Sequence, residues 1–203
     1  FKKSIYIYID LGSTATLDTD LNKLVLAQIG DQLYQKYGVN LSNASFVERV
    51  YREDIKKFDD GLFGRYKETN TDKYEEKLLE YLYNLQSNTR DHTKKAIEQI
   101  AKERQKQIII CIDNADQRDF DIQQEAFLIS QELAKEWKAT VFLSVRPQTF
   151  YKSKRSGALN AYPHKIFTIS PPRVDDVVSK RLGFAAKLAR GESSRVDLGQ
   201  VTS

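Results

Sequence analysis

The sequence predicts an α/β fold: a three-layer sandwich with a largely parallel central sheet flanked by helices, plus a helical insertion. One observation is that residues 5–9 and 108–112 form short runs dominated by Ile, Tyr and Cys, as expected for strands buried inside a parallel sheet. The other is that helical periodicity occupies the stretches between the predicted strands. Strands that alternate with helices are typical of βαβ units and a parallel sheet.

Composition fits one compact domain that can bury a core. The chain has 203 residues, of which 40% are hydrophobic and 30% charged. Its net charge of +4 permits phosphate or nucleic acid partners without indicating them. Because no apolar run is long enough to span a membrane and no signal peptide opens the chain, we expect no membrane partner and a cytoplasmic location.

The first half of the chain contains one predicted strand, one predicted helix and a predicted insertion. Residues 5–9 read IYIYI, a strand pattern. Residues 20–37 place apolar side chains mostly at helical spacing, and Gly38 predicts the helix end. Residues 41–104 form the expected helical insertion, which ends in two amphipathic helices.

The second predicted strand covers residues 108–113 and is followed by helical periodicity over residues 120–137. A third strand is expected over residues 139–145, and Pro147 predicts a turn after it because proline cannot donate to a sheet hydrogen bond. The lone Cys111 lies inside the second strand, where we expect it to pack as a small apolar residue.

Near the C-terminus we expect a short strand over residues 165–169 and a helix over residues 173–189. The predicted core domain therefore covers residues 1–190. The polar residues 191–203 lack clear helical periodicity, so we interpret them as a linker, a displaced segment or a disordered tail.

The run IIICIDNADQ, residues 108–117, holds the most informative side chains. An almost purely aliphatic strand ends on Asp113, and Asp116 follows three residues later. Ligands of open α/β sheets bind at the carboxyl ends of the strands, so Asp113 is expected to project into such a site. The alternative is that Asp113 only satisfies the backbone of a turn, as Asp often does.

This run resembles the Walker B strand of P-loop NTPases. The next helix and the strand ending near Arg146 follow the order found in the STAND and AAA-related branch, where a polar or arginine residue senses nucleotide. The resemblance implies Mg²⁺ and ATP as cofactors, with Asp113 holding Mg²⁺ through water. It also implies that Asp116 or Asn114 orients the attacking water and that Arg146 contacts the γ-phosphate.

Two features depart from that family pattern. In the commonest AAA pattern a Glu follows the Walker B Asp, whereas Asn114 follows Asp113 here, so hydrolysis is less firmly implied than nucleotide binding. None of the nine glycines is followed by Lys, so no Walker A phosphate loop is present. We expect that loop before Phe1, in a longer protein from which this chain is a fragment; a degenerate domain is the alternative.

Two other segments have competing interpretations. Residues 10–14 read DLGST after a strand, which resembles the first phosphate motif of the actin and sugar-kinase superfamily, although a helix rather than a second strand is predicted next. After the third strand, a loop is expected to carry Lys152, Lys154 and Arg155. These side chains could contact nucleic acid or a neighbouring subunit, or they could be solvated charges.

The function predicted from the sequence is the nucleotide-binding core of a larger bacterial-type signalling or defence NTPase. Binding of Mg-ATP would control self-association or an attached effector domain. The chain would be an ATPase only if an upstream phosphate loop exists. The alternative is a degenerate, non-hydrolysing module of NTPase fold that binds protein or nucleic acid.

Overall fold

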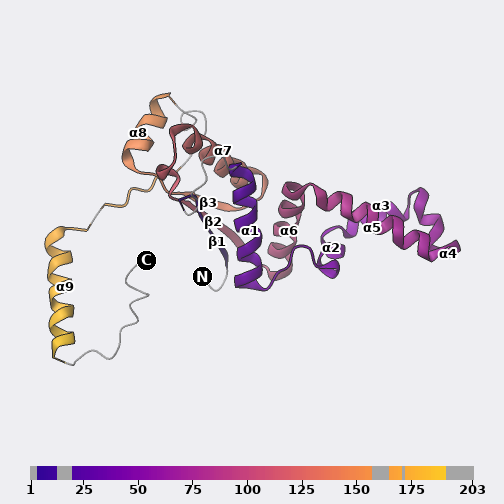
Figure 1. Ribbon diagram of the computed structural model, residues 1–203, viewed down its shortest axis with the longest axis horizontal. Helices are drawn as coiled ribbons and strands as arrows, with labels where there is room; N and C mark the ends of the chain where they lie inside the picture. The colour runs from indigo at the N-terminus through magenta and orange to yellow at the C-terminus, as the bar shows by residue number, and fades with distance from the viewer. Residues whose placement is uncertain (1–3, 13–19, 157–164, 171, 191–203) are drawn as a thin grey trace. The chain divides into compact units, whose positions relative to one another are not determined.

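The computed structural model describes residues 4–12, 20–156, 165–170 and 172–190, and the chain divides into two compact units. The first unit covers Phe1–Pro163 and the second covers His164–Ser203. The last helix of the chain, labelled α9 in Figure 1, lies within the second unit.

Three parallel strands form the sheet of the first unit, in the order β1-β2-β3. They are β1 (Ser4–Asp10), β2 (Gln107–Asp113) and β3 (Thr140–Leu143). The predicted parallel sheet flanked by helices is therefore confirmed. β3 ends two residues earlier than expected, because the chain turns toward a helix that begins at Pro147.

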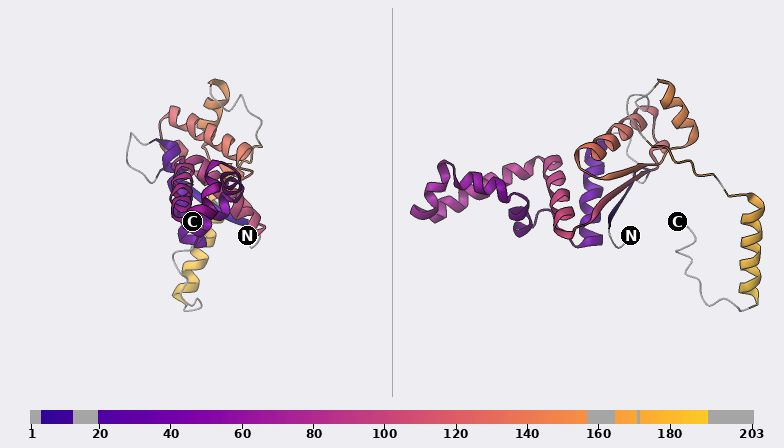
Figure 2. Two further views of the ribbon diagram at one scale, coloured as in Figure 1. Left: turned by 90° about the vertical axis from the view of Figure 1, so that its right-hand side faces the viewer. Right: turned by 180° about the vertical axis from the view of Figure 1, so that it is seen from behind.

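The helices of the first unit fall into two groups. Those near the sheet are α1 (Leu21–Tyr37), α6 (Thr89–Arg104), the short 3₁₀ helix η2 (Ala115–Gln117), α7 (Phe120–Glu136) and α8 (Pro147–Ser156). The others are α2 (Ala44–Val50), α3 (Arg52–Asp59), the 3₁₀ helix η1 (Leu62–Arg65), α4 (Tyr66–Thr69) and α5 (Thr71–Ser87). This second group forms an arm that extends away from the sheet (Figures 1 and 2).

α1 forms where the sequence predicts it. The Asp20 side chain accepts a hydrogen bond from Lys23 N at the start of the helix, and Gly38 adopts a left-handed φ of 65° at its end. The buried residues of α1 recur every fourth position: Leu21, Val25, Ile29 and Leu33. This stripe is what fixes α1 against the sheet.

The two faces of the sheet are buried to different degrees. Alternate residues of β1 and β2 are at most 2% exposed on one face: Ile5, Ile7, Ile9, Ile108, Ile110 and Ile112. They form the main core with residues of α1, α6 and α7. The residues between them are only partly buried: Tyr6, Tyr8, Asp10, Ile109, Cys111 and Asp113. α6, which we placed in the insertion, contributes to the main core through Ala96, Ile97 and Ile100.

Side chains of α1 occupy the outer edge of β1. Each of three polar residues bonds both the N–H and the C=O of one strand residue: Tyr37 bonds Tyr6, Gln32 bonds Tyr8 and Gln28 bonds Asp10. These backbone groups are therefore satisfied without a neighbouring strand.

The arm has a small core of its own, in which Val47, Tyr51 and Leu82 are buried. The Tyr51 hydroxyl lies 3.0 Å from His92 Nδ1 and joins the arm to α6. Phe58 stacks on Phe63 and Tyr81, whose ring centroids lie 5.7 and 5.1 Å away. The helical insertion is thus an ordered element with aromatic packing.

The second unit contains α9 (Val174–Ala189). The strand predicted over residues 165–169 is wrong, because the described residues 165–170 form no strand and are all exposed. Their β-branched and aromatic residues favour a strand, but a strand also needs a partner and a surface to pack on. The interpretation of residues 191–203 concerns a segment outside the described residues.

Candidate functional site

Two carboxylates end adjacent strands at the carboxyl edge of the sheet. Asp10 of β1 is in register with Asp113 of β2, and neighbouring strands of a sheet lie about 4.8 Å apart. Asp113 is where the sequence predicts it. Asp10 was singled out only in the competing actin-like motif and not as part of the Walker B site, although it ends the run IYIYI as Asp113 ends IIICI. The parallel register is what brings the two together.

Hydrogen bonds fix the Asp113 carboxylate. Its Oδ2 accepts a hydrogen bond of 2.9 Å from the Tyr8 hydroxyl, and its Oδ1 accepts one of 2.8 Å from Asn114 N. Burial alone would raise the pKa of Asp113. Hydrogen bonds from Asn114 N, Tyr8 and Ser144 outweigh burial and hold this pKa below its usual value. Asp113 is therefore a stable anion at neutral pH.

Asn114 bridges the ends of the first two strands. Its Nδ2 donates a 2.8 Å hydrogen bond to Asp10 Oδ1, and its Oδ1 accepts one of 3.1 Å from Gln117 Nε2. Its φ of 59° lies in the left-handed region, which Asn tolerates better than most residues. Asn114 was predicted to orient water, but both the nitrogen and the oxygen of its side-chain amide are already hydrogen-bonded to other side chains.

The backbone after β1 lies close against the residues after β2. Gly12 N donates to Asp10 Oδ1 over 2.9 Å, and Arg118 Nε donates to Leu11 O over 2.8 Å. A Cβ added at Gly12 would lie 2.5 Å from Gln117 Oε1. A larger residue at position 12 would therefore displace the Gln117 side chain from this position. Ser13 and Thr14, which complete the actin-like motif, lie outside the described residues.

The predicted catalytic acid and the predicted sensor arginine form an ion pair. Arg146 Nε lies 2.5 Å from Asp116 Oδ2. The Asp116 side chain is 10% exposed and the Arg146 side chain 69% exposed, and Oδ2 makes no aligned hydrogen bond. The contact joins η2 to the residues after β3, so all three strand ends contribute to this edge of the sheet.

The predicted basic loop is wrong, because these residues form the helix α8. Ser153 is buried and its hydroxyl donates to Gln124 Oε1 over 2.8 Å, which packs α8 against α7. Lys152 Nζ lies 4.1 Å from the centre of the Phe120 ring. Lys154 and Arg155 are exposed. The three basic residues therefore do not share one environment.

The donor set at this edge suits a hard divalent cation. Mg²⁺ is usually bound by one or two carboxylates together with waters and substrate phosphates. Asp113 and Asp10 supply two carboxylates. Within the described part of the chain, no three His, Cys, Asp or Glu side chains come together, so a metal held by protein ligands alone is not indicated there. Two carboxylates fit a Mg²⁺ ion whose remaining ligands are not protein side chains.

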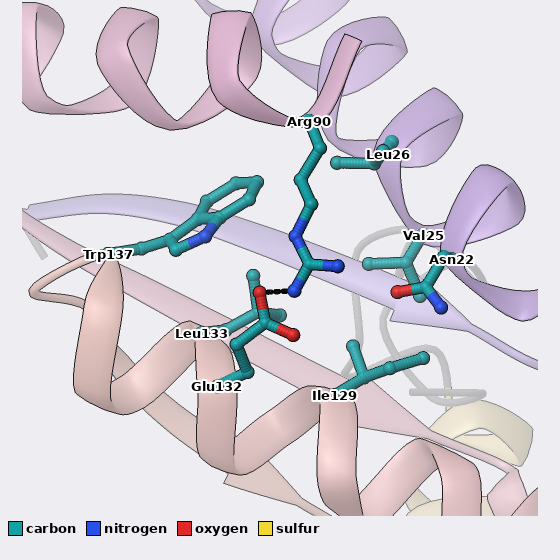
Figure 3. Close-up of a pocket in the computed structure, with 8 residues that line it drawn as sticks. All are labelled: Asn22, Val25, Leu26, Arg90, Ile129, Glu132, Leu133 and Trp137. Atoms are coloured by element: carbon teal, nitrogen blue, oxygen red, sulfur yellow. Dashed lines mark ion pairs between the residues drawn. The ribbon is translucent and has the colours of Figure 1, made fainter. Parts of the chain in front are cut away.

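A separate small cavity lies between α1, α6 and α7 (Figure 3). An ion pair between Arg90 and Glu132 crosses it, and Val25, Ile129 and Leu133 supply apolar walls. Trp137 also lines the cavity and is 2% exposed, and its Nε1 has no hydrogen-bond partner among the described residues. None of the predicted site residues lines this cavity.

No protein-family model, no curated protein and no solved structure matches this chain. Each described helix is too short or too polar to cross a lipid bilayer.

Proposed function

We propose that this chain is the nucleotide-binding part of a P-loop NTPase of the STAND or AAA-related class. The observation that carries the proposal is the group of Asp10, Asp113 and Asn114 at the carboxyl edge of a parallel sheet, where open α/β sheets bind their ligands. Mg-ATP is the proposed ligand. When bound, Mg²⁺ would neutralise phosphate charge.

Each residue has a stated task in this proposal. Asp113 would hold Mg²⁺ through water, and its pKa below the usual value keeps it charged. Arg146, whose side chain is 69% exposed, would contact the γ-phosphate. Asp116, which is paired with Arg146 here, would orient the attacking water. Asn114 keeps the ends of β1 and β2 together.

The two outer edges of the sheet differ. Side chains of α1 occupy the outer edge of β1, whereas in the described part of the chain no strand pairs with the outer edge of β3. A strand that leads into a phosphate loop would pair with this edge of β3 in the proposed fold. Its carboxyl end would lie next to Arg146, which follows β3. Control of assembly or of an effector domain, and a cytoplasmic location, are proposed from the sequence alone.

The test uses the natural protein together with any residues that precede Phe1. We expect it to bind ATP with Mg²⁺ in calorimetric titration, and Asp113→Ala to lower hydrolysis at least about 100-fold. Asp31→Ala, at an exposed carboxylate of α1, is the matched control and should leave turnover unchanged. Equal turnover by Asp113→Ala and the parent protein would refute the assignment.

A second candidate is a non-hydrolysing module of the same fold that binds protein or nucleic acid. It is favoured because the two residues proposed to orient water, Asn114 and Asp116, already interact with other side chains. Asn114 is bonded at both ends of its amide, and Asp116 is paired with Arg146. This candidate predicts that the natural protein shows no ATP hydrolysis above background.

A further inference from the structure

The outer face of α8 is basic and carries an exposed aromatic ring. Tyr151 and Arg155 are four residues apart and therefore lie on the same side of the helix, with Lys154 beside them. Tyr151 is 64% exposed, and no ion pair of Lys154 or Arg155 is found within the described residues. Ser153 faces the opposite side and packs on α7. The basic face is thus directed away from the unit's own core.

The outer face of α5 is acidic and apolar. Leu79 and Tyr83, also four residues apart, are 67% and 72% exposed, whereas Tyr74 and Leu82 of the same helix are buried. Exposed carboxylates surround the exposed pair: Asp72, Glu75, Glu76 and Glu80. Glu80 pairs with Lys77, but the other three have no ion pair in the part of the chain that the structure describes.

The two faces cannot meet within one molecule of the first unit. α8 packs on α7 beside the sheet, and α5 lies in the arm on the other side of the sheet, as two opposite views agree (Figures 1 and 2). They match in chemistry, because one offers cations around a tyrosine and the other offers anions around a leucine and a tyrosine. We propose that the basic face of α8 binds the acidic face of α5 on a second copy of this chain.

This contact joins two different surfaces, so each copy keeps one free face of each kind. Such head-to-tail contacts generate rings when the rotation closes and open chains of subunits when it does not. The charges accelerate encounter and fix the pairing, while the exposed aromatic and aliphatic groups supply apolar area. A nucleic acid would account for the basic face alone and would be repelled by the acidic one, which favours the second copy.

Sedimentation of the 203-residue chain tests the proposal. We expect concentration-dependent association that weakens when salt rises from about 0.05 M to about 0.5 M, because exposed charges are screened. Two charge-reversed proteins, Glu75→Lys/Glu76→Lys and Lys154→Glu/Arg155→Glu, should each raise the dissociation constant at least about tenfold. The control Asp31→Lys/Glu48→Lys makes the same charge change as Glu75→Lys/Glu76→Lys, at exposed sites of α1 and α2, and should leave association unaltered.

Combining the four reversals in one chain should restore association, because the two faces have then exchanged charge. Mixing the two charge-reversed proteins should also give a complex, since each retains one original face. Circular dichroism verifies that every variant is folded. The proposal is overturned if the parent chain stays monomeric at all concentrations, or if the reversals change its mass no more than the control does. Loss of binding to a labelled DNA in Lys154→Glu/Arg155→Glu without a change in mass would overturn it too, in favour of nucleic acid.

Discussion

The two faces of the sheet are held in different ways. One face carries six isoleucines that are at most 2% exposed and that pack against α1, α6 and α7. The other carries tyrosines, a cysteine and two carboxylates that are only partly buried and are joined by hydrogen bonds. Apolar burial therefore stabilises the fold on one side, while polar groups remain accessible for a ligand on the other. Substitutions can separate the two contributions.

The largest expected effect is at Ile110, which is fully buried. Ile110→Ala should lower the free energy of unfolding by about 2–5 kcal/mol, because it removes apolar contacts and leaves a cavity. Ile109→Ala, at the next position on the partly buried face, should cost less than about half of that. Urea unfolding followed by circular dichroism measures both. Equal losses would show that the two faces are equally buried in solution.

A smaller effect is expected at the edge of β1. The backbone groups of its partly buried residues are hydrogen-bonded to side chains of α1. Gln32→Ala removes both hydrogen bonds to Tyr8 and should cost about 1–2 kcal/mol, because it leaves two backbone groups without their partner. Gln35→Ala, at an exposed position of the same helix, is the matched control and should change the free energy of unfolding by less than about 0.5 kcal/mol. A loss at Gln32 no larger than at Gln35 would mean that water replaces the glutamine readily.

The smallest effect concerns the protonation of Tyr8. Its hydrogen bond to Asp113, with burial, raises the pKa of Tyr8 to about 12. Because the folded pKa lies above the ordinary value of 10.0, this contribution to stability is complete below pH 10 and is lost as pH rises toward 12. Absorbance titration of the parent protein minus that of Tyr8→Phe should show a group ionising near pH 12.

Replacing the acceptor sharpens the same comparison. In Asp113→Asn, the difference titration should move down toward pH 10, because the charged partner is gone. An unchanged titration would show that burial, not the hydrogen bond, sets the pKa of Tyr8.

Strong local patterns were sufficient to predict much of the fold. The runs IYIYI and IIICI and the four-residue spacing of Leu21, Val25, Ile29 and Leu33 each gave an element that the structure contains. The segment over residues 165–169 has equally favourable strand residues and yet forms no strand. Strand propensity describes a half-buried position on a sheet, so it fails where no sheet is available.

The site was only partly predictable for a related reason. Asp113 follows an almost purely aliphatic strand and could be identified from sequence alone. The position of Asp10 beside Asp113 depends on the parallel register of β1 and β2. The ion pair of Asp116 with Arg146 joins residues 30 positions apart, so no local pattern could predict it. The helix α8 was missed because its basic run suggested a loop, whereas the buried Ser153 and its contact with α7 stabilise a helix.

Trp137 is the only tryptophan in the sequence, and it lines the cavity that the Arg90–Glu132 ion pair crosses. Its fluorescence therefore has a single origin, at the junction of three helices behind the isoleucine face. Emission from a ring this well shielded should shift to longer wavelength when water reaches it. The natural protein thus carries its own optical probe for loosening of the helical layer, and this probe needs no label. No residue of the proposed nucleotide site lines the cavity in which the Trp137 ring lies.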